Sequence, residues 1–190
     1  MEYIFTLKYA LPGNDYDLDS IVDSLGEAGC DDALIGIGQP GRLALEFTRE
    51  ATDAKAAIGS ALDDVRRVTP FAKLIEVAPD LVGLTDVATI LGMSRQNMRK
   101  IMLSHQKSFP LPVHDGKIAL WHLADILSWL QDKRNYQFDH KLLDVARVAL
   151  HVNLEKENQR FCHRHASFII ASKSFCASQP NCVFARLGSA

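Results

Sequence analysis

Polar residues with clear binding chemistry lie between positions 94 and 117 of the chain. They are Ser94, Arg95, Gln96, Arg99, Lys100 and Lys117. An arginine can donate two hydrogen bonds to guanine, and a glutamine can pair with adenine in the same bidentate way. A serine hydroxyl at the start of a helix can hold a phosphate. We therefore predict that Arg95 and Gln96 contact bases and that Ser94 contacts a phosphate of double-stranded DNA.

The remaining members of this set follow at helical spacing or lie further along the chain. Arg99 and Lys100 come one turn later and are predicted to reach bases or phosphates. Lys117 is predicted to reach a phosphate or the minor groove. Asn97 falls near the flank of the same face, so its contact with DNA is left open.

No arrangement typical of catalysis accompanies these residues. The sequence lacks a nucleophile beside a general base and lacks a metal constellation, so we predict neither an enzyme nor a cofactor. The residues of zinc-ligand type near the end of the chain are Cys162, His163, His165, Cys176 and Cys182. Because their spacing matches no standard zinc site, we predict free thiols and surface histidines, with zinc binding as the alternative.

Two short helical patterns must position the binding residues. Thr85 is the expected cap of the first, which turns Val87, Ala88 and Leu91 inward. Ser94 is the expected cap of the second, which turns Met98 and Ile101 inward. Gly92 lies between them, where a turn can require a positive φ. This pattern predicts a helix-turn-helix, and an ordinary corner between two helices is the alternative.

A hairpin and a third helix follow. Asp115-Gly116 is a strong hairpin signal and predicts two short strands within residues 111–121. The next segment predicts a helix whose inward residues are Leu123, Ile126, Leu127 and Leu130. A helix-turn-helix, a hairpin and a helix in this order make a winged arrangement.

Residues 82–130 resemble the winged-helix DNA-binding domain of the MerR and phage-excisionase type. The matching pieces are Val87-Ala88, Leu91-Gly92-Met93-Ser94-Arg95, Phe109-Pro110-Leu111-Pro112, Trp121, Asp125-Ile126 and Trp129-Leu130. They cover about fifty of 190 residues, and their order is more specific than any single piece. The resemblance implies a transcriptional regulator whose helix 95–103 enters the major groove and whose hairpin 111–121 is the wing.

The front of the chain alternates strand and helix patterns. Strands are predicted at residues 3–11, 33–37, 43–48 and 72–78. One helix begins at Leu18 with Asp17 as its cap and ends at Gly26 and Gly29, and a second begins at Thr52-Asp53. The order βαββαβ predicts a ferredoxin-like fold. Its predicted role is dimerisation, sensing of a small molecule or binding of a protein partner.

The end of the chain begins with a helical pattern at residues 140–160. Its spaced apolar residues are Leu142, Val145, Ala149 and Val152, with Leu143, Leu150 and Leu154 beside them. The pattern fits a dimer helix or packing on the winged module equally well. The sequence after Ser174 has no clear periodicity, and we predict an irregular tail.

Positive and negative residues are distributed unevenly along the chain. Residues 1–80 carry 7 Lys and Arg against 15 Asp and Glu, whereas residues 81–140 carry 7 against 5 and residues 141–190 carry 7 against 3. Only the back half can therefore favour a nucleic acid. No apolar run approaches the roughly 18 residues of a membrane span, and the start lacks a basic leader. Together with four cysteines, this predicts a cytoplasmic protein with reduced thiols.

These inferences combine into one α+β prediction. The expected domains are a ferredoxin-like domain at 1–79, a winged helix-turn-helix domain at 80–132, and a C-terminal helix with an irregular tail at 133–190. Since one small winged module buries little DNA surface, we also predict a homodimer. Two alternatives remain open, namely an adaptor whose winged module binds protein and an excisionase-like architectural protein that bends DNA.

Overall fold

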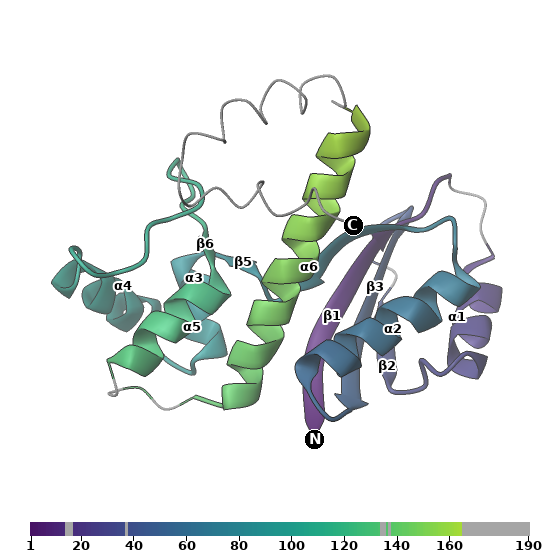
Figure 1. The fold of residues 1–190 in the computed structure, drawn as a ribbon, viewed down its shortest axis with the longest axis horizontal. Helices are drawn as coiled ribbons and strands as arrows, with labels where there is room; N and C mark the ends of the chain where they lie inside the picture. The colour runs from purple at the N-terminus through teal and green to yellow at the C-terminus, as the bar shows by residue number, and fades with distance from the viewer. Residues whose placement is uncertain (14–16, 37, 134–135, 137, 165–190) are drawn as a thin grey trace, which may run out of the picture. The chain divides into compact units, whose positions relative to one another are not determined.

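The computed structural model describes residues 1–13, 17–36, 38–133, 136 and 138–164, with residues 18, 163 and 164 described by their backbone alone. Within these ranges the chain has a four-stranded antiparallel sheet, a two-stranded sheet and six helices (Figure 1). The predicted α+β class is confirmed. The chain divides into two compact units, residues 1–152 and 153–190. None of the described helices is both long enough and apolar enough to cross a membrane.

The larger sheet is built from the front of the chain. Its strands are β1 (Glu2–Ala10), β2 (Ala33–Gly36), β3 (Arg42–Glu50) and β4 (Lys73–Ala78). They lie in the order β2-β3-β1-β4, and neighbouring strands run antiparallel. Burial alternates along β1, where Phe5 and Leu7 are buried and Ile4 is exposed. Phe5 pairs with Phe47 of β3, and their rings stack with centroids 5.2 Å apart.

Two helices complete this part of the fold. They are α1 (Leu18–Glu27) and α2 (Ala54–Val68). The carboxylate of Asp17 accepts a hydrogen bond from the Ser20 N–H at 3.3 Å, and that of Asp53 accepts one from the Ala56 N–H at 2.8 Å. These caps satisfy N–H groups that a helix start leaves without partners. The predicted order of strands and helices is therefore confirmed through residue 78.

The middle of the chain adds three helices and two short strands. They are β5 (Leu81–Val82), α3 (Leu84–Ile90), α4 (Arg95–Ser104), β6 (Trp121–His122) and α5 (Leu123–Asp132). The strand β5 pairs with β6, which the sequence patterns did not predict. The three helices share a core that includes Val87, Met98, Trp121 and Leu127.

Two expectations for this region are corrected. The first helix begins at Leu84 with Gly83 as its cap residue, so Thr85 lies inside the helix. Its first turn is held by Asp86, whose carboxylate accepts the Gly83 N–H at 2.8 Å. The predicted hairpin has no paired strands and is closed by a single bridge between His114 and Leu120. Its second half pairs elsewhere, because Trp121 is drawn into the core beside β5.

The last helix, α6 (His140–Arg164), confirms and extends the predicted one. Its residues up to position 152 contribute to two apolar clusters. Val145 and Ala149 belong to the cluster of the four-stranded sheet, whereas Leu143 and Ala146 belong to the cluster of α3, α4 and α5. The apolar face that the sequence offered for a dimer is thus buried within one chain as far as Val152, and Leu154 is exposed.

Candidate nucleic-acid interface

The turn between α3 and α4 sets the direction in which α4 leaves the core. Gly92 has a φ of 63°, a conformation that residues with a side chain seldom adopt. The Met93 N–H then donates to the Ala88 carbonyl at 2.8 Å, which closes the end of α3. Ala88 itself is buried in the shared core, as predicted. The turn therefore depends on Gly92 for its backbone and on Ala88 for its core packing.

Ser94 caps α4, as predicted from its position before the helical pattern. Its Oγ accepts a hydrogen bond from the Asn97 N–H at 3.2 Å. The hydroxyl hydrogen of Ser94 stays available to donate outward, next to the positive end of the helix dipole. Asn97 is exposed, and its side-chain amide lies 3.8 Å from the sulfur of Met93. The start of α4 is therefore capped by a side chain and has the polarity that suits an anion.

The side chains of α4 separate into two faces. Met98 and Ile101 are buried in the core. The exposed residues include all four that we predicted on this helix: Arg95, Gln96, Arg99 and Lys100. Positions one turn apart lie on the same side of a helix, so these four form one continuous surface opposite the buried pair. The structure thus brings the predicted residues of α4 together on one exposed face.

The charge of this surface is not neutralised. The helix contains three cationic residues and no Asp or Glu. Among the described residues, no carboxylate lies within ion-pair distance of Arg95, Arg99 or Lys100. In the front of the chain, by contrast, Lys8 pairs with Glu76 at 2.7 Å. The cations of α4 can therefore pair with phosphates without first breaking an ion pair.

Lys117 lies on a separate element, the loop 113–120. The bridge at its base consists of the Leu120 N–H donating to the His114 carbonyl at 3.0 Å and the His114 N–H donating to the Leu120 carbonyl at 3.3 Å. The Val113 N–H donates to the same Leu120 carbonyl at 2.8 Å. Lys117 is exposed in this loop. The His114 ring lies against Gly116, where an added Cβ would come within 2.5 Å of its Nε2. The loop therefore holds its cation on a compact turn.

Sequence patterns missed two features in the middle of the chain. Lys107 is a further exposed cation after α4, and its charge was the only available signal. The second feature is a contact between Asp80 and His122, whose Oδ1 and Nδ1 atoms are 2.7 Å apart. Asp80 also accepts the Leu123 N–H through its carbonyl at 2.8 Å. These bonds hold the start of α5 against the segment before β5, and no local pattern links residues 42 positions apart.

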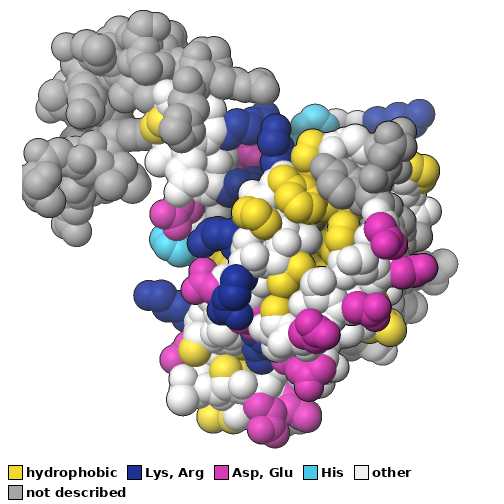
Figure 2. Space-filling model, turned by 90° about the vertical axis from the view of Figure 1, so that its right-hand side faces the viewer, with side chains coloured by type: hydrophobic (Ala, Val, Ile, Leu, Met, Phe, Trp, Pro, Cys, Tyr) yellow, Lys and Arg dark blue, Asp and Glu magenta, His cyan; other side chains and the backbone are white. Residues whose placement is uncertain are grey.

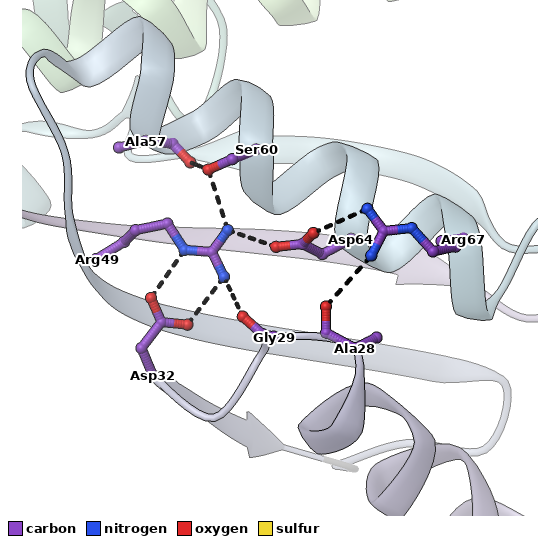
Figure 3. A network of polar contacts seen from close by, with 8 residues as sticks. All are labelled: Ala28, Gly29, Asp32, Arg49, Ala57, Ser60, Asp64 and Arg67. Atoms are coloured by element: carbon purple, nitrogen blue, oxygen red, sulfur yellow. Dashed lines mark hydrogen bonds and ion pairs between the residues drawn. The ribbon is translucent and has the colours of Figure 1, made fainter.

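A second polar cluster lies in the front of the chain and is built around Arg49 (Figure 3). Its guanidinium donates to both carboxylate oxygens of Asp32, to Asp64 at 2.7 Å, and to the Gly29 carbonyl and the Ser60 hydroxyl. Hydrogen bonds to Asp32 raise the pKa of Arg49 above its ordinary value. Burial raises the pKa of the nearby Cys30 thiol, and the charge of Asp64 adds to that rise.

This cluster is better explained as a structural clamp than as a site. Every nitrogen of the Arg49 guanidinium already has a partner, and its side chain is only 8% exposed. A ligand would have to displace bonds that join β3, α2 and the turn after α1. Figure 2 shows Asp and Glu side chains concentrated along one side of the visible face, with Lys and Arg side chains along the other. The exposed face of α4, rather than this cluster, is therefore the candidate site.

The residues of zinc-ligand type remain mostly beyond the described part of the chain. Cys162 is partly buried in α6, with its sulfur 3.7 Å from Asn158 Oδ1. The side chain of His163 and the whole of His165, Cys176 and Cys182 lie outside the described residues. Elsewhere in the described chain, no three side chains of His, Cys, Asp or Glu gather as a metal site would require.

Comparison with known proteins adds no assignment. No protein-family model matches the sequence, and no curated protein matches it.

Proposed function

We propose that the protein is a sequence-specific double-stranded-DNA-binding protein that regulates transcription. In this proposal α3, the turn at Gly92 and α4 form a helix-turn-helix, and the loop 113–120 is the wing. The observation that most supports this proposal is the exposed face of α4. Its Arg95, Arg99 and Lys100 have no acidic partner among the described residues. A helix with this face fits the major groove and supplies both phosphate contacts and base readout.

The distribution of charge supports this placement. Residues 95–117 contain five cationic residues (Arg95, Arg99, Lys100, Lys107 and Lys117) against one acid (Asp115), a net charge of +4. The modest charge of the whole segment 81–140 therefore hides a strongly basic stretch. The front of the chain is acidic, so repulsion from phosphates directs it away from a bound duplex. Positive charge is concentrated where the proposal needs it.

We also propose that the front of the chain is a ferredoxin-like module. The strand order β2-β3-β1-β4, with a helix after β1 and another after β3, supports this proposal. Because that fold serves many unrelated functions, the order alone assigns none. Its proposed role is to dimerise the protein, to sense a small molecule or to bind a protein partner. Paired half-sites on DNA would match a symmetric dimer.

A selection from a random duplex library with the full-length protein tests the proposed function. We expect one sequence motif to be enriched, and we expect binding to weaken as salt rises. The Arg95→Ala/Arg99→Ala double variant should lose the enrichment. Lys55→Ala is the matched control, because Lys55 is an exposed cation at the start of α2 in the acidic front of the chain.

Two outcomes would contradict the proposal. If the wild-type protein binds no duplex even at low salt, the winged module is better explained as a protein-binding adaptor. If the Lys55→Ala variant loses as much binding as the double variant, the surface on α4 is not the interface. Enrichment that disappears only in the double variant supports the assignment of α4.

A further inference from the structure

The four-stranded sheet packs on helices with one of its two faces. Buried side chains of β1 and β3, such as Phe5 and Phe47, share a core with residues of α1 and α2. Successive residues of a strand point to opposite faces of the sheet. The even-numbered residues of β1 and β3, with their partners on β2 and β4, therefore form a second face, which we call the open face. On it Ile4 is 61% exposed and Leu34 is 74% exposed.

The middle of the open face consists mostly of small side chains. Thr6, Ala44 and Ala78 lie there on three neighbouring strands and are partly exposed. Such side chains allow a second sheet to approach to the usual separation of about 10 Å. The charges of Lys8 and Glu76 already pair with each other at 2.7 Å. The middle can therefore be covered by another sheet without breaking that ion pair.

The two ends of the open face carry opposite charges. At one end Glu2 and Glu50 are paired directly across β1 and β3. At the other end Arg42 and Lys73 lie on either side of Ala10. The four charged side chains are exposed, and none has an ion-pair partner among the described residues. Because like charges directly opposite each other on a sheet repel, each end gains from an added counter-charge.

We propose that a second copy of the chain packs on the open face, with its strands running in the opposite direction. A two-fold axis between the sheets and across the strands places Glu50 of each copy over Arg42 of the other. Both ends then receive their counter-charges at once, as a symmetric interface requires. This inference rests on the dimerising role proposed above for the front of the chain and names the surface that performs it.

The balance of charge favours a second copy over another partner. Of residues 1–80, the open face carries three of the seven Lys and Arg but only four of the fifteen Asp and Glu. The rest of the front is strongly acidic, so two copies repel each other elsewhere. A basic partner would match one end of the open face and an acidic partner the other end. Only a partner with the same arrangement, turned around, matches both.

The size of the open face is sufficient for such a contact. The strands β1 and β3 are each nine residues long, and β2 and β4 are shorter. At about 3.3 Å per residue and roughly 4.8 Å between strands, the four strands outline roughly 450 Å². With the relief of the side chains, two such faces bury about 1,000 Å², the lower limit for a specific interface. We therefore expect a dimer that dissociates on dilution.

Sedimentation equilibrium of the full-length protein without DNA tests the proposal. The wild type should dimerise reversibly, and salt should weaken the dimer because the end charges are exposed. Arg42→Glu should raise the dissociation constant at least about tenfold by placing like charges together. Glu50→Arg should do the same, although it relieves the repulsion from Glu2 within one chain. The double variant Arg42→Glu/Glu50→Arg should restore the dimer.

Two further variants make the test specific. Lys55→Glu is the matched control, because it makes the same charge change on α2, at the covered face of the sheet. Glu46 lies midway between Arg42 and Glu50 on β3, so the proposed axis brings the two Glu46 carboxylates of the dimer near each other. Glu46→Gln should therefore tighten the dimer. Thermal melting shows that each variant is folded.

The outcomes separate this inference from the proposed function. A wild-type protein that stays monomeric, or single variants that dimerise like the wild type, would overturn the interface. A double variant that fails to recover, no tightening in Glu46→Gln, or an equal loss in Lys55→Glu would overturn it as well. None of these results touches the assignment of α4, since the samples contain no DNA. A wild-type dimer that binds no duplex would contradict the DNA-binding function alone.

Discussion

At the scale of single residues, Arg95 and Lys117 should affect DNA binding in different ways. Arg95 lies in the first turn of α4, where base contacts are expected, whereas Lys117 lies on the loop. Arg95→Ala should cost about 1–3 kcal/mol of binding free energy and relax base choice at one position. Lys117→Ala should weaken binding to all sequences about equally. It should also lower the slope of the logarithm of the binding constant against the logarithm of the salt concentration by roughly one in magnitude. Titrations on the selected motif and on random DNA measure both effects. Equal losses on the two DNAs for Arg95→Ala would exclude base readout.

Arg49 offers a residue-scale prediction about stability. Its substitution by Met keeps a long side chain but leaves Asp32 without its cation, Asp64 with Arg67 alone, and the Gly29 carbonyl without its donor. Removing one partner from a buried ion pair costs about 3–5 kcal/mol, and partial exposure of Asp32 places this case toward the lower end. Denaturant unfolding measures the loss. Arg67→Ala removes an exposed partner of Asp64 and should cost less than about 1 kcal/mol. Equal effects of the two variants would refute the clamp.

At the scale of elements, the contact between α3 and α4 decides whether the binding face is presented correctly. Ala88 is 2% exposed in the shared core, and the turn begins with the bond from Met93 to its carbonyl. Ala88→Leu adds volume that a packed interior does not absorb freely. It should cost about 1–3 kcal/mol of stability and abolish specific DNA binding. Thermal melting and a binding titration check the two effects separately. If both stay unchanged, the helix-turn-helix interpretation is wrong.

At the scale of the whole molecule, α6 should couple the two apolar clusters. Val145 belongs to the cluster of the sheet and Leu143 to the cluster of the other helices. Val145→Ala removes two methyl groups and should lower the free energy of unfolding by about 2 kcal/mol, whereas Leu143→Ala should lower it by about 2–5 kcal/mol. Calorimetry should show one unfolding transition, and both variants should lower its midpoint temperature. Leu154→Ala is the exposed control on the same helix. Two transitions, each shifted by only one variant, would show that the clusters unfold independently.

The oligomeric state is a further prediction at this scale. We expect the full-length protein to be at least a dimer, with the front of the chain as the dimer element. The helix at 142–154 is less favoured as the dimer element, because Val145 and Ala149 are already buried within one chain. A fragment of residues 1–80 would lack these two side chains and expose their contact surface. Light scattering should therefore use the whole chain as well as that fragment. A monomeric whole chain would favour the adaptor alternative.

Local features of this protein were set by the sequence itself. Asp17, Asp53 and Ser94 each cap a helix by accepting an N–H three residues later, so a short window contains the whole interaction. Alternation along β1 and helical spacing in α4 likewise depend on neighbours in the chain. The same local signals placed the exposed cations of α4 on one face. Thr85 shows the limit, since Gly83 with Asp86 starts that helix two residues earlier.

Only the tertiary structure decided the contacts between distant segments. Trp121 pairs with Val82 rather than with a hairpin partner, because burying its indole in the shared core favours that strand. Arg49 binds Asp32 and Asp64, which lie 17 and 15 residues away in the sequence. Asp80 contacts His122, which lies 42 residues away. The division of α6 between two clusters also depends on which surfaces meet. Such contacts are settled by the competition of whole apolar surfaces for burial, and that competition leaves no periodic trace in the sequence.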